Sequence, residues 1–326
     1  MNAMWHTLRV LQPISPAIAG HPEDCQPMGQ PVCQPWPEGQ GWIMSRNLDG
    51  FFRHIAACNT AVLPGGRLEF RLGTQPAGWV QPDLLPVLLR HGMTHAGHVV
   101  TLPDPARLEQ VGEAMAREGA YRSHHELFDV WTDMALPPVA RIDRGALPLF
   151  GLMAAGVHLN GLVRRPDGLH LWIARRSMTK RLDPGKLDHL VAGGIPAGHT
   201  AAQALIKEAA EEASLPPELV AHARATADIR YALDRPEGLR RDVLHCFELE
   251  LPANFVPTPA DGEVEEFRLI PLEEAYALVR DTDEFKFNVN LVLIDLFLRT
   301  GMIDPATPEG QRLRRGLTGW HAPKPD

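Results

Sequence analysis

Residues 193–215 read GGIPAGHTAAQALIKEAAEEASL and predict a glycine-rich loop that leads into a helix over Thr200–Ala213. Residues three and four apart share a helix face, so Glu208, Glu211 and Glu212 converge. Three like charges on one turn repel each other, and a hard divalent cation such as Mg²⁺ would neutralise them through oxygen ligands. The preceding glycines let the backbone approach an ion or a phosphate closely. The alternative is a solvated acidic face, which is usual for a Glu-rich helix taken alone.

This segment resembles the Nudix box, G-x5-E-x7-R-E-U-x-E-E-x-G-U, where U is aliphatic. The spacing matches throughout, and four positions match in identity: Gly193, Glu208, Glu211 and Glu212. Three positions depart from the pattern: His199 stands for the early Glu, Lys207 for the Arg and Ser214 for the late Gly. In the family, the early Glu and the Arg support the loop–helix geometry. Their joint loss therefore indicates a paired change around the metal site rather than loss of its ligands.

The resemblance extends to a particular Nudix subgroup, which carries an extra N-terminal domain of uncharacterised function and is labelled thiamine-pyrophosphokinase-related. The stretches that carry it are FRHIAACN (52–59), GVHLNG (156–161), PGKLD (184–188), GGIPAG (193–198) and DEFKFN (283–288). Plant and yeast members resemble thiamine diphosphate phosphatases that also act on oxidised thiamine diphosphates. The resemblance implies a Nudix α/β/α sandwich with a mixed sheet, preceded by a small α+β domain, and covers roughly residues 46–303.

The resemblance also implies a reaction, the Mg²⁺-dependent (or Mn²⁺-dependent) hydrolysis of a small-molecule diphosphate such as thiamine diphosphate. The expected metal ligands are Glu208, Glu211, Glu212 and the Gly193 carbonyl. One of these carboxylates, or a nearby Glu, would act as general base for the attacking water. We expect Glu263 to supply an additional carboxylate, because Val264 and Phe267 fit buried strand positions better. The alternative for residues 263–266 is an acidic loop.

Four basic residues between the expected hairpin and the glycine loop are candidate phosphate contacts: Arg175, Arg176, Lys180 and Lys186. Basic side chains on an exposed turn are more often solvated than functional, so the expectation concerns the group rather than each member. His158, His170 and His189 are assigned no role, because isolated histidines are more often packed or surface residues. Cys246 is expected in the core of a strand.

Hydrophobic periodicity divides the chain into four parts. Residues 1–43 are rich in Pro, Gly and Gln, and they predict either a disordered or extended tail or an upstream extension from a misassigned start codon. Residues 46–145 predict a small α+β domain with helices near 47–59, 84–90 and 105–118 and strands near 68–72 and 78–80. Residues 150–303 predict the Nudix domain, and 304–326 a C-terminal tail. The Nudix part is expected to hold strands near 156–164, 169–174, 225–232, 243–250 and 265–270, and helices near 200–213, 218–223, 272–280 and 288–299.

Composition excludes several classes of protein. The chain has 326 residues with 44% hydrophobic and 22% charged residues, which describes an ordinary globular protein. A formal net charge of -8 without a dense basic stripe disfavours nucleic-acid binding. No stretch is long and apolar enough for a membrane helix, and prolines interrupt the one segment that resembles a signal peptide. The 4 cysteines show no disulfide or zinc pattern, so a reducing cytoplasm is expected.

The N-terminal domain is expected to form a pocket wall, a dimer surface or both, so a homodimer remains one of the alternatives.

Two alternatives to the hydrolase remain at this stage. The stretch around Arg175 and Lys180 also resembles an isopentenyl-diphosphate isomerase. That enzyme needs a cysteine in a strand motif and histidine metal ligands, and we find neither in the sequence, which disfavours this alternative. A non-catalytic binding module of the same fold is the other alternative. Such modules usually lose metal carboxylates, and all three are present here, which favours an enzyme.

Overall fold

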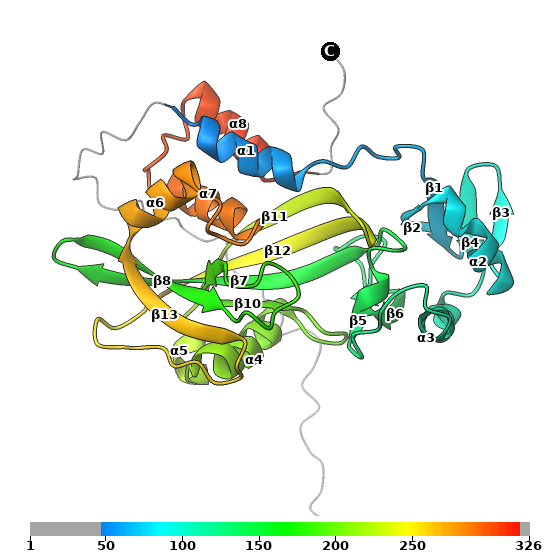
Figure 1. The fold of residues 1–326 in the computed structure, drawn as a ribbon, viewed down its shortest axis with the longest axis horizontal. Coiled ribbons are helices and arrows are strands. Elements are labelled where there is room, and N and C mark those ends of the chain that lie inside the picture. Colours follow the sequence, from blue (N-terminus) through cyan, green and yellow to red (C-terminus); the bar gives the residue numbers. More distant parts are fainter. Residues whose placement is uncertain (1–46, 320–326) are drawn as a thin grey trace, which may run out of the picture. The chain divides into compact units, whose positions relative to one another are not determined.

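The computed structural model describes residues 47–319, so the tail expected over 1–43 lies outside the described residues. Within this range, none of the helices is long and apolar enough to cross a membrane. The residues form three sheets and the helices that pack on them (Figure 1).

The largest sheet has seven strands and is mixed. Its path runs β11-β12-β7-β8-β13, with β10 paired to β7 and β9 paired to β8. Strands β7 and β12 pair in parallel, whereas the other pairings in this sheet are antiparallel. The bounds are β7 Met153–Arg165, β8 Gly168–Arg176, β9 Leu187–His189, β10 Val191–Gly194, β11 Arg224–Arg235, β12 Gly238–Glu250 and β13 Val264–Pro271.

Helices cover both faces of this sheet, as Figure 1 shows. On one face lie α4 (Ala201–Ala213) and α5 (Pro217–Val220), and on the other lie α1 (Asp49–Cys58), α6 (Leu272–Asp281), α7 (Val289–Arg299) and α8 (Pro308–Gly316). Nine of the ten side chains from Val289 to Leu298 are buried, all but Asp295, because α7 packs against α1, α6, α8 and β11. This arrangement confirms the expected α+β fold, a mixed sheet between two helical layers.

The N-terminal part has its own hydrophobic core, formed by residues such as Phe70, Leu88, Leu102 and Met115. Its four-stranded sheet has the order β2-β1-β4-β3, and β5 and β6 form a separate hairpin. The bounds are β1 Leu68–Leu72, β2 Gln75–Val80, β3 Thr94–Ala96, β4 Val99–Leu102, β5 Leu127–Val130 and β6 Ala140–Asp143, with α2 at Leu85–Arg90 and α3 at Leu108–Arg117. Short 3-10 turns precede α2 and α3 at Pro82–Leu84 and Pro105–Arg107, and a third lies at Arg144–Ala146.

Several expected elements differ from the structure in extent. The turn expected over residues 73–77 is shorter, because Gly73 adopts a φ of 60° and β2 already begins at Gln75. The helix expected over 218–223 spans only Pro217–Val220. Strands β3, β4, β5, β6, β9 and β10 were not expected, and α8 lies in the stretch 304–326 where no element was expected. Helix α1 packs on α6, α7 and α8, so it belongs structurally with the larger sheet.

Candidate active site

Local sequence signals define both ends of α4. Thr200 caps the N-terminus: its side chain accepts from the Gln203 N–H, and the Gln203 side chain accepts from the Thr200 N–H at 2.9 Å. The helix ends at Ser214, whose φ of 54° lies in the left-handed region. This conformation explains why the box pattern has glycine here. In this chain the Ser214 hydroxyl donates to the Thr258 carbonyl at 3.0 Å.

The three box carboxylates differ in exposure and in hydrogen-bond partners. Glu212 is 8% exposed, and its Oε2 accepts a hydrogen bond of 2.9 Å from the Ala192 N–H. The Glu208 carboxylate lies against Gly193, where an added Cβ would come within 2.4 Å of its Oε2. The Glu211 side chain is 51% exposed and accepts from the Lys207 ammonium at 2.6 Å. The apolar side of α4 packs on β7 and β10, and this packing brings the expected ligands to the glycine loop.

Lys207 supplies a positive charge to the carboxylate face. Its ammonium lies 3.2 Å from Glu208 Oε1 and 2.6 Å from Glu211 Oε2. The two carboxylates therefore share one cationic partner, which relieves part of the repulsion expected from the sequence. Lys207 stands where the box pattern has Arg.

The donor set fits a hard divalent cation. Burial, together with the charges of Asp188 and Glu208, raises the pKa of Glu212 to about 8, although the Ala192 N–H and Lys180 act in the opposite direction. Burial likewise raises the pKa of Glu208. Carboxylates that burial pushes towards their neutral form regain charge when a cation binds them through oxygen. The Gly193 carbonyl lies over Gly156, where an added Cβ would come within 3.0 Å of the oxygen, so glycine at 156 keeps its surroundings open.

The expected acidic residue Glu263 immediately precedes β13, and Val264, the first residue of the strand, is buried as expected. Its side chain forms an ion pair with Lys180, and its carbonyl accepts from the Ser177 N–H at 2.8 Å. Lys180 also lowers the pKa of Glu212, so it lies within electrostatic range of the box carboxylates. The structure thus brings Lys180 and Glu263 together beside the box.

The other three basic candidates bind groups of the protein. Arg175 donates to the Gly185 carbonyl at 2.8 Å and pairs with Glu266 at 3.3 Å. Lys186 donates to the Asp283 carbonyl. Arg176 is buried and pairs with Asp188 at 2.7 Å, so it faces the interior rather than the carboxylate face.

Sequence reasoning missed a buried cluster of His158, Asp188 and His189. The two imidazoles share a hydrogen bond of 2.9 Å between their Nδ1 atoms. One ligand atom from each of the three residues lies within 4.8 Å of the others, a spacing that could hold a metal ion. Arg176 and Lys286 already pair with Asp188 at 2.7 and 3.4 Å, however, and two cations there oppose a third. The signal available in the sequence was the Asp-His pair just before the glycine loop.

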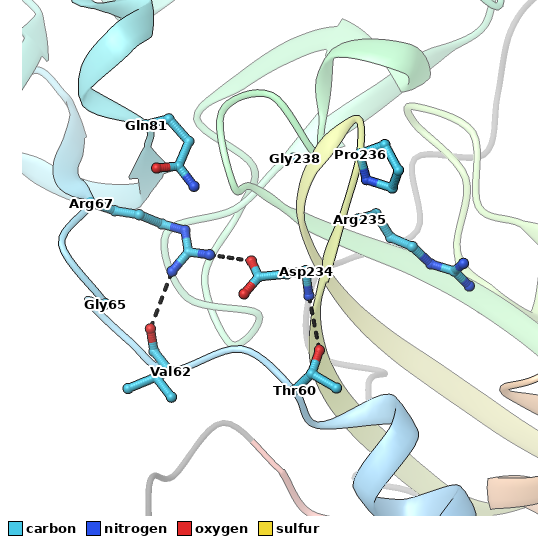
Figure 2. A pocket seen from close by; sticks show the side chains of 9 residues that line it. All are labelled: Thr60, Val62, Gly65, Arg67, Gln81, Asp234, Arg235, Pro236 and Gly238. Carbon is cyan, nitrogen blue, oxygen red and sulfur yellow. Dashed lines mark hydrogen bonds and ion pairs between the residues drawn. The ribbon is translucent and has the colours of Figure 1, made fainter.

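A cavity of about 380 Å³ lies away from the carboxylates, beside the turn between β11 and β12 (Figure 2). In Figure 2 Arg67 reaches towards Asp234 and the Val62 carbonyl, and the Asp234 N–H donates to the Thr60 hydroxyl at 3.2 Å. Its charged groups Arg67 and Asp234 pair with each other. The lining residues include none of the box carboxylates, so this cavity is separate from the candidate active site.

The fold and the carboxylate helix together define a Nudix-type hydrolase. A family model described as NUDIX domain matches residues 156–290. Nudix hydrolase 24, chloroplastic, from Arabidopsis thaliana is 36% identical over 288 residues, which cover 84% of this chain and 79% of the relative. Nudix hydrolase 20, chloroplastic, from the same plant is 42% identical over 181 residues, or 56% of this chain and 48% of the relative. The chain therefore belongs to the Nudix hydrolase family.

A crystal structure of DR0079 from Deinococcus radiodurans is similar with a TM-score of 0.39 and 21% identity, covering 58% of this chain and 98% of that one. A similarity at this level adds nothing to the fold assignment, which rests on the strand topology and the family match.

Family membership makes this chain an enzyme that hydrolyses diphosphate linkages in small-molecule substrates, a reaction for which Nudix hydrolases use divalent metal ions. The expected cytoplasmic location was wrong, since both Arabidopsis relatives are chloroplastic proteins by name. The physical reason is that cysteine usage reports on the redox state of a compartment and not on which reducing compartment it is.

Proposed function

We propose that this Nudix hydrolase cleaves thiamine diphosphate, or its oxidised derivatives, to the monophosphate and inorganic phosphate. The observation that carries the proposal is that the five stretches similar to the thiamine-related subgroup are linked by contacts, and that one of them, the glycine loop, leads directly into the carboxylate helix. They are 52–59, 156–161, 184–188, 193–198 and 283–288. A resemblance scattered over unconnected parts of the surface would say little about substrate, whereas stretches that contact one another and include the loop before the carboxylate helix form a shared structural unit.

The contacts run from α1 towards the glycine loop. Arg53 pairs with Asp283 at 3.4 Å, and the Leu187 N–H donates to the Glu284 carbonyl at 2.9 Å. Lys286 then reaches Asp188 at 3.4 Å.

The glycine loop joins the same region through the larger sheet. Gly193 pairs with Val157 in the antiparallel ladder of β10 and β7. This pairing joins the stretch 156–161 to the stretch 193–198, which leads into the carboxylate helix.

We assign the box carboxylates Glu208, Glu211 and Glu212 and the Gly193 carbonyl to a Mg²⁺ or Mn²⁺ ion. A bound divalent cation neutralises the phosphate charge that would otherwise repel the attacking water. Glu263, or one of the box carboxylates, accepts the proton of that water. Lys180 pairs with Glu263, and we assign it the contact with a phosphate.

The test is a phosphate-release assay on the purified full chain with Mg²⁺, across thiamine, nucleoside and sugar diphosphates. We expect thiamine diphosphate to be cleaved and thiamine monophosphate to be left intact, because a monophosphate lacks the adjacent phosphates that position the water. A chelator should stop the reaction. Equal or faster hydrolysis of nucleoside diphosphate derivatives would overturn the thiamine assignment. No hydrolysis of any diphosphate with metal present would instead favour a binding module.

A further inference from the structure

The loop between β10 and α4 carries the metal-binding box, yet two of its backbone N–H groups bind a distant part of the chain. The Ala197 N–H donates to the Leu127 carbonyl at 2.8 Å, and the Gly198 N–H donates to Asp129 Oδ2 at 2.7 Å. Leu127 and Asp129 both lie in β5 of the N-terminal part. The glycine loop is therefore held from outside the sheet to which β10 belongs.

The Asp129 side chain is buried and held in place by a second hydrogen bond. Its carboxylate is buried, with the residue 5% exposed, and its second oxygen accepts from Arg141 Nε at 3.2 Å across the hairpin. A hydrogen bond to an ionised acceptor is roughly twice as strong as a neutral one. Gly198 adopts a φ of 79°, a conformation that side chains disfavour. The backbone of the loop is thus in a positive-φ conformation at Gly198, the residue that Asp129 binds.

A second contact from the same hairpin reinforces the first. The Phe128 ring fills the space beside Gly194, where an added Cβ would come within 2.5 Å of the ring. Arg144 lies over this ring, 5.5 Å from its centroid, and pairs with Glu126 at 3.0 Å. The hairpin therefore contacts the glycine loop through the Phe128 side chain as well as through the acceptors of Leu127 and Asp129.

The box of this chain departs from the pattern that it resembles at the two positions expected to support this loop. His199 and Lys207 stand where the box pattern has Glu and Arg, and two basic side chains cannot form an ion pair. In this structure the His199 ring lies 3.3 Å from the Ala197 carbonyl, and Lys207 binds Glu208 and Glu211. The support that the Glu–Arg pair supplies elsewhere must come from other residues.

We propose that Asp129 is a positioning residue for the reaction: through the Gly198 N–H it holds the loop at the start of α4 and takes over the role of the missing loop–helix ion pair. The N-terminal part is thereby a component of the active site. The proposal rests on the box as the reacting centre and is independent of which diphosphate is cleaved.

The test uses the full chain and the diphosphate that the wild-type protein cleaves best. Asp129→Ala should lower kcat by about 10- to 100-fold, because a small displacement of a catalytic group is enough for such a loss. Asp129→Asn keeps an acceptor for the Gly198 N–H and should retain most of the activity. Asp133→Ala is the matched control, since Asp133 lies in the loop of the same hairpin and its side chain, among residues 47–319, accepts only from the nearby Ala135 N–H at 2.9 Å. This control should leave kcat unchanged.

Two further measurements separate positioning from folding. In Asp129→Ala, hydrogen exchange of the amides in 195–200 should rise while exchange in β7 and β12 stays as in the wild type, and Mn²⁺ alone should bind more weakly. Restoring the family pair with His199→Glu and Lys207→Arg should then raise activity more in the Asp129→Ala background than in the wild-type background.

The decisive quantity is the coupling, which is the difference between the effects of the restored pair in the Asp129→Ala and wild-type backgrounds. Zero or negative coupling between the restored pair and Asp129→Ala would overturn the proposal, as would unchanged loop exchange in Asp129→Ala. A wild-type protein that cleaves no diphosphate would be a failure of the proposed function instead, and the exchange and Mn²⁺ measurements would still test the role of Asp129.

Discussion

The Ala192 N–H donates a hydrogen bond of 2.9 Å to Oε2 of Glu212, which ties the strand before the glycine loop to the helix after it. Both ends of the loop are thus held by a carboxylate, Glu212 at the β10 side and Asp129 at the α4 side. Glu212 satisfies a backbone donor with Oε2, so in the proposed function its other oxygen would bind the cation.

Glu212→Gln should lower kcat at least about 100-fold while the protein stays folded, because the loss of one preorganised electrostatic group costs this much in other enzymes. The amide keeps the volume of the side chain and can still accept from the Ala192 N–H. The melting temperature without metal should be unchanged or higher, since burial already disfavours the charged form of Glu212 and the amide cannot become charged. Glu218→Gln, an exposed change on α5, is the control. Wild-type turnover of Glu212→Gln at saturating metal would refute the site assignment.

Ser214 provides a test of the helix end. Its left-handed φ costs a non-glycine residue about 1–2 kcal/mol. Both Ser214→Gly and Ser214→Ala lose the hydrogen bond to Thr258, but only glycine relieves the strain. The free energy of unfolding of the glycine variant should therefore exceed that of the alanine variant by about 1–2 kcal/mol, measured by urea denaturation. Equal stabilities would show that this backbone conformation carries no strain.

Acid should destabilise the protein through its buried histidines. Burial lowers the pKa of His189 to about 4, with Lys286 lowering it and Asp188 opposing. Burial, with the charges of His189 and Lys286, also lowers the pKa of His158 well below its usual value. Because the unfolded chain binds more protons than the folded one between pH 6.5 and 4, stability should fall as pH falls through this window.

The pKa shift of His189 corresponds to a loss of about 3 kcal/mol in the free energy of unfolding once the pH is below 4. Urea denaturation of the wild type and of His189→Gln between pH 7 and 4 measures this contribution. The variant should show the shallower pH dependence, and His222→Gln, which changes an exposed histidine outside the cluster, should match the wild type. Parallel curves for all three proteins would contradict the prediction.

Asp188 should be among the least replaceable residues of the chain. Lys286 and Arg176 hold the pKa of this buried carboxyl well below its usual range, although burial alone would raise it. Asp188→Asn leaves these cations without their counter-charge, which should cost about 3–5 kcal/mol of folding free energy. Asp167→Asn, at a side chain that is 71% exposed, should change stability by less than about 0.5 kcal/mol. A small effect of Asp188→Asn would mean that the two cations are solvated.

Local sequence patterns were sufficient to predict a helix or strand when the element itself carries a capping residue and a clear hydrophobic period. The helix expected over Thr200–Ala213 appears as α4 with Thr200 as its cap, because a capping residue and a 3.6-residue period are both readable in sequence. Helix α8 was missed because its buried residues are only Gly310 and Leu313, which is too few to produce a period. Strands β9 and β10 were missed because each has at most four residues, and such short runs show no clear alternation.

The sequence by itself determined the box: its spacing places Glu208, Glu211 and Glu212 on one side of a helix that follows a glycine loop, because helix geometry depends only on positions along the chain. Only the tertiary structure decided what surrounds that box. The pairing of Arg176 and Lys286 with Asp188, and the contact of Asp129 with Gly198, join residues far apart in sequence. Periodicity shows which face of an element is buried but carries no information about the distant element that covers it.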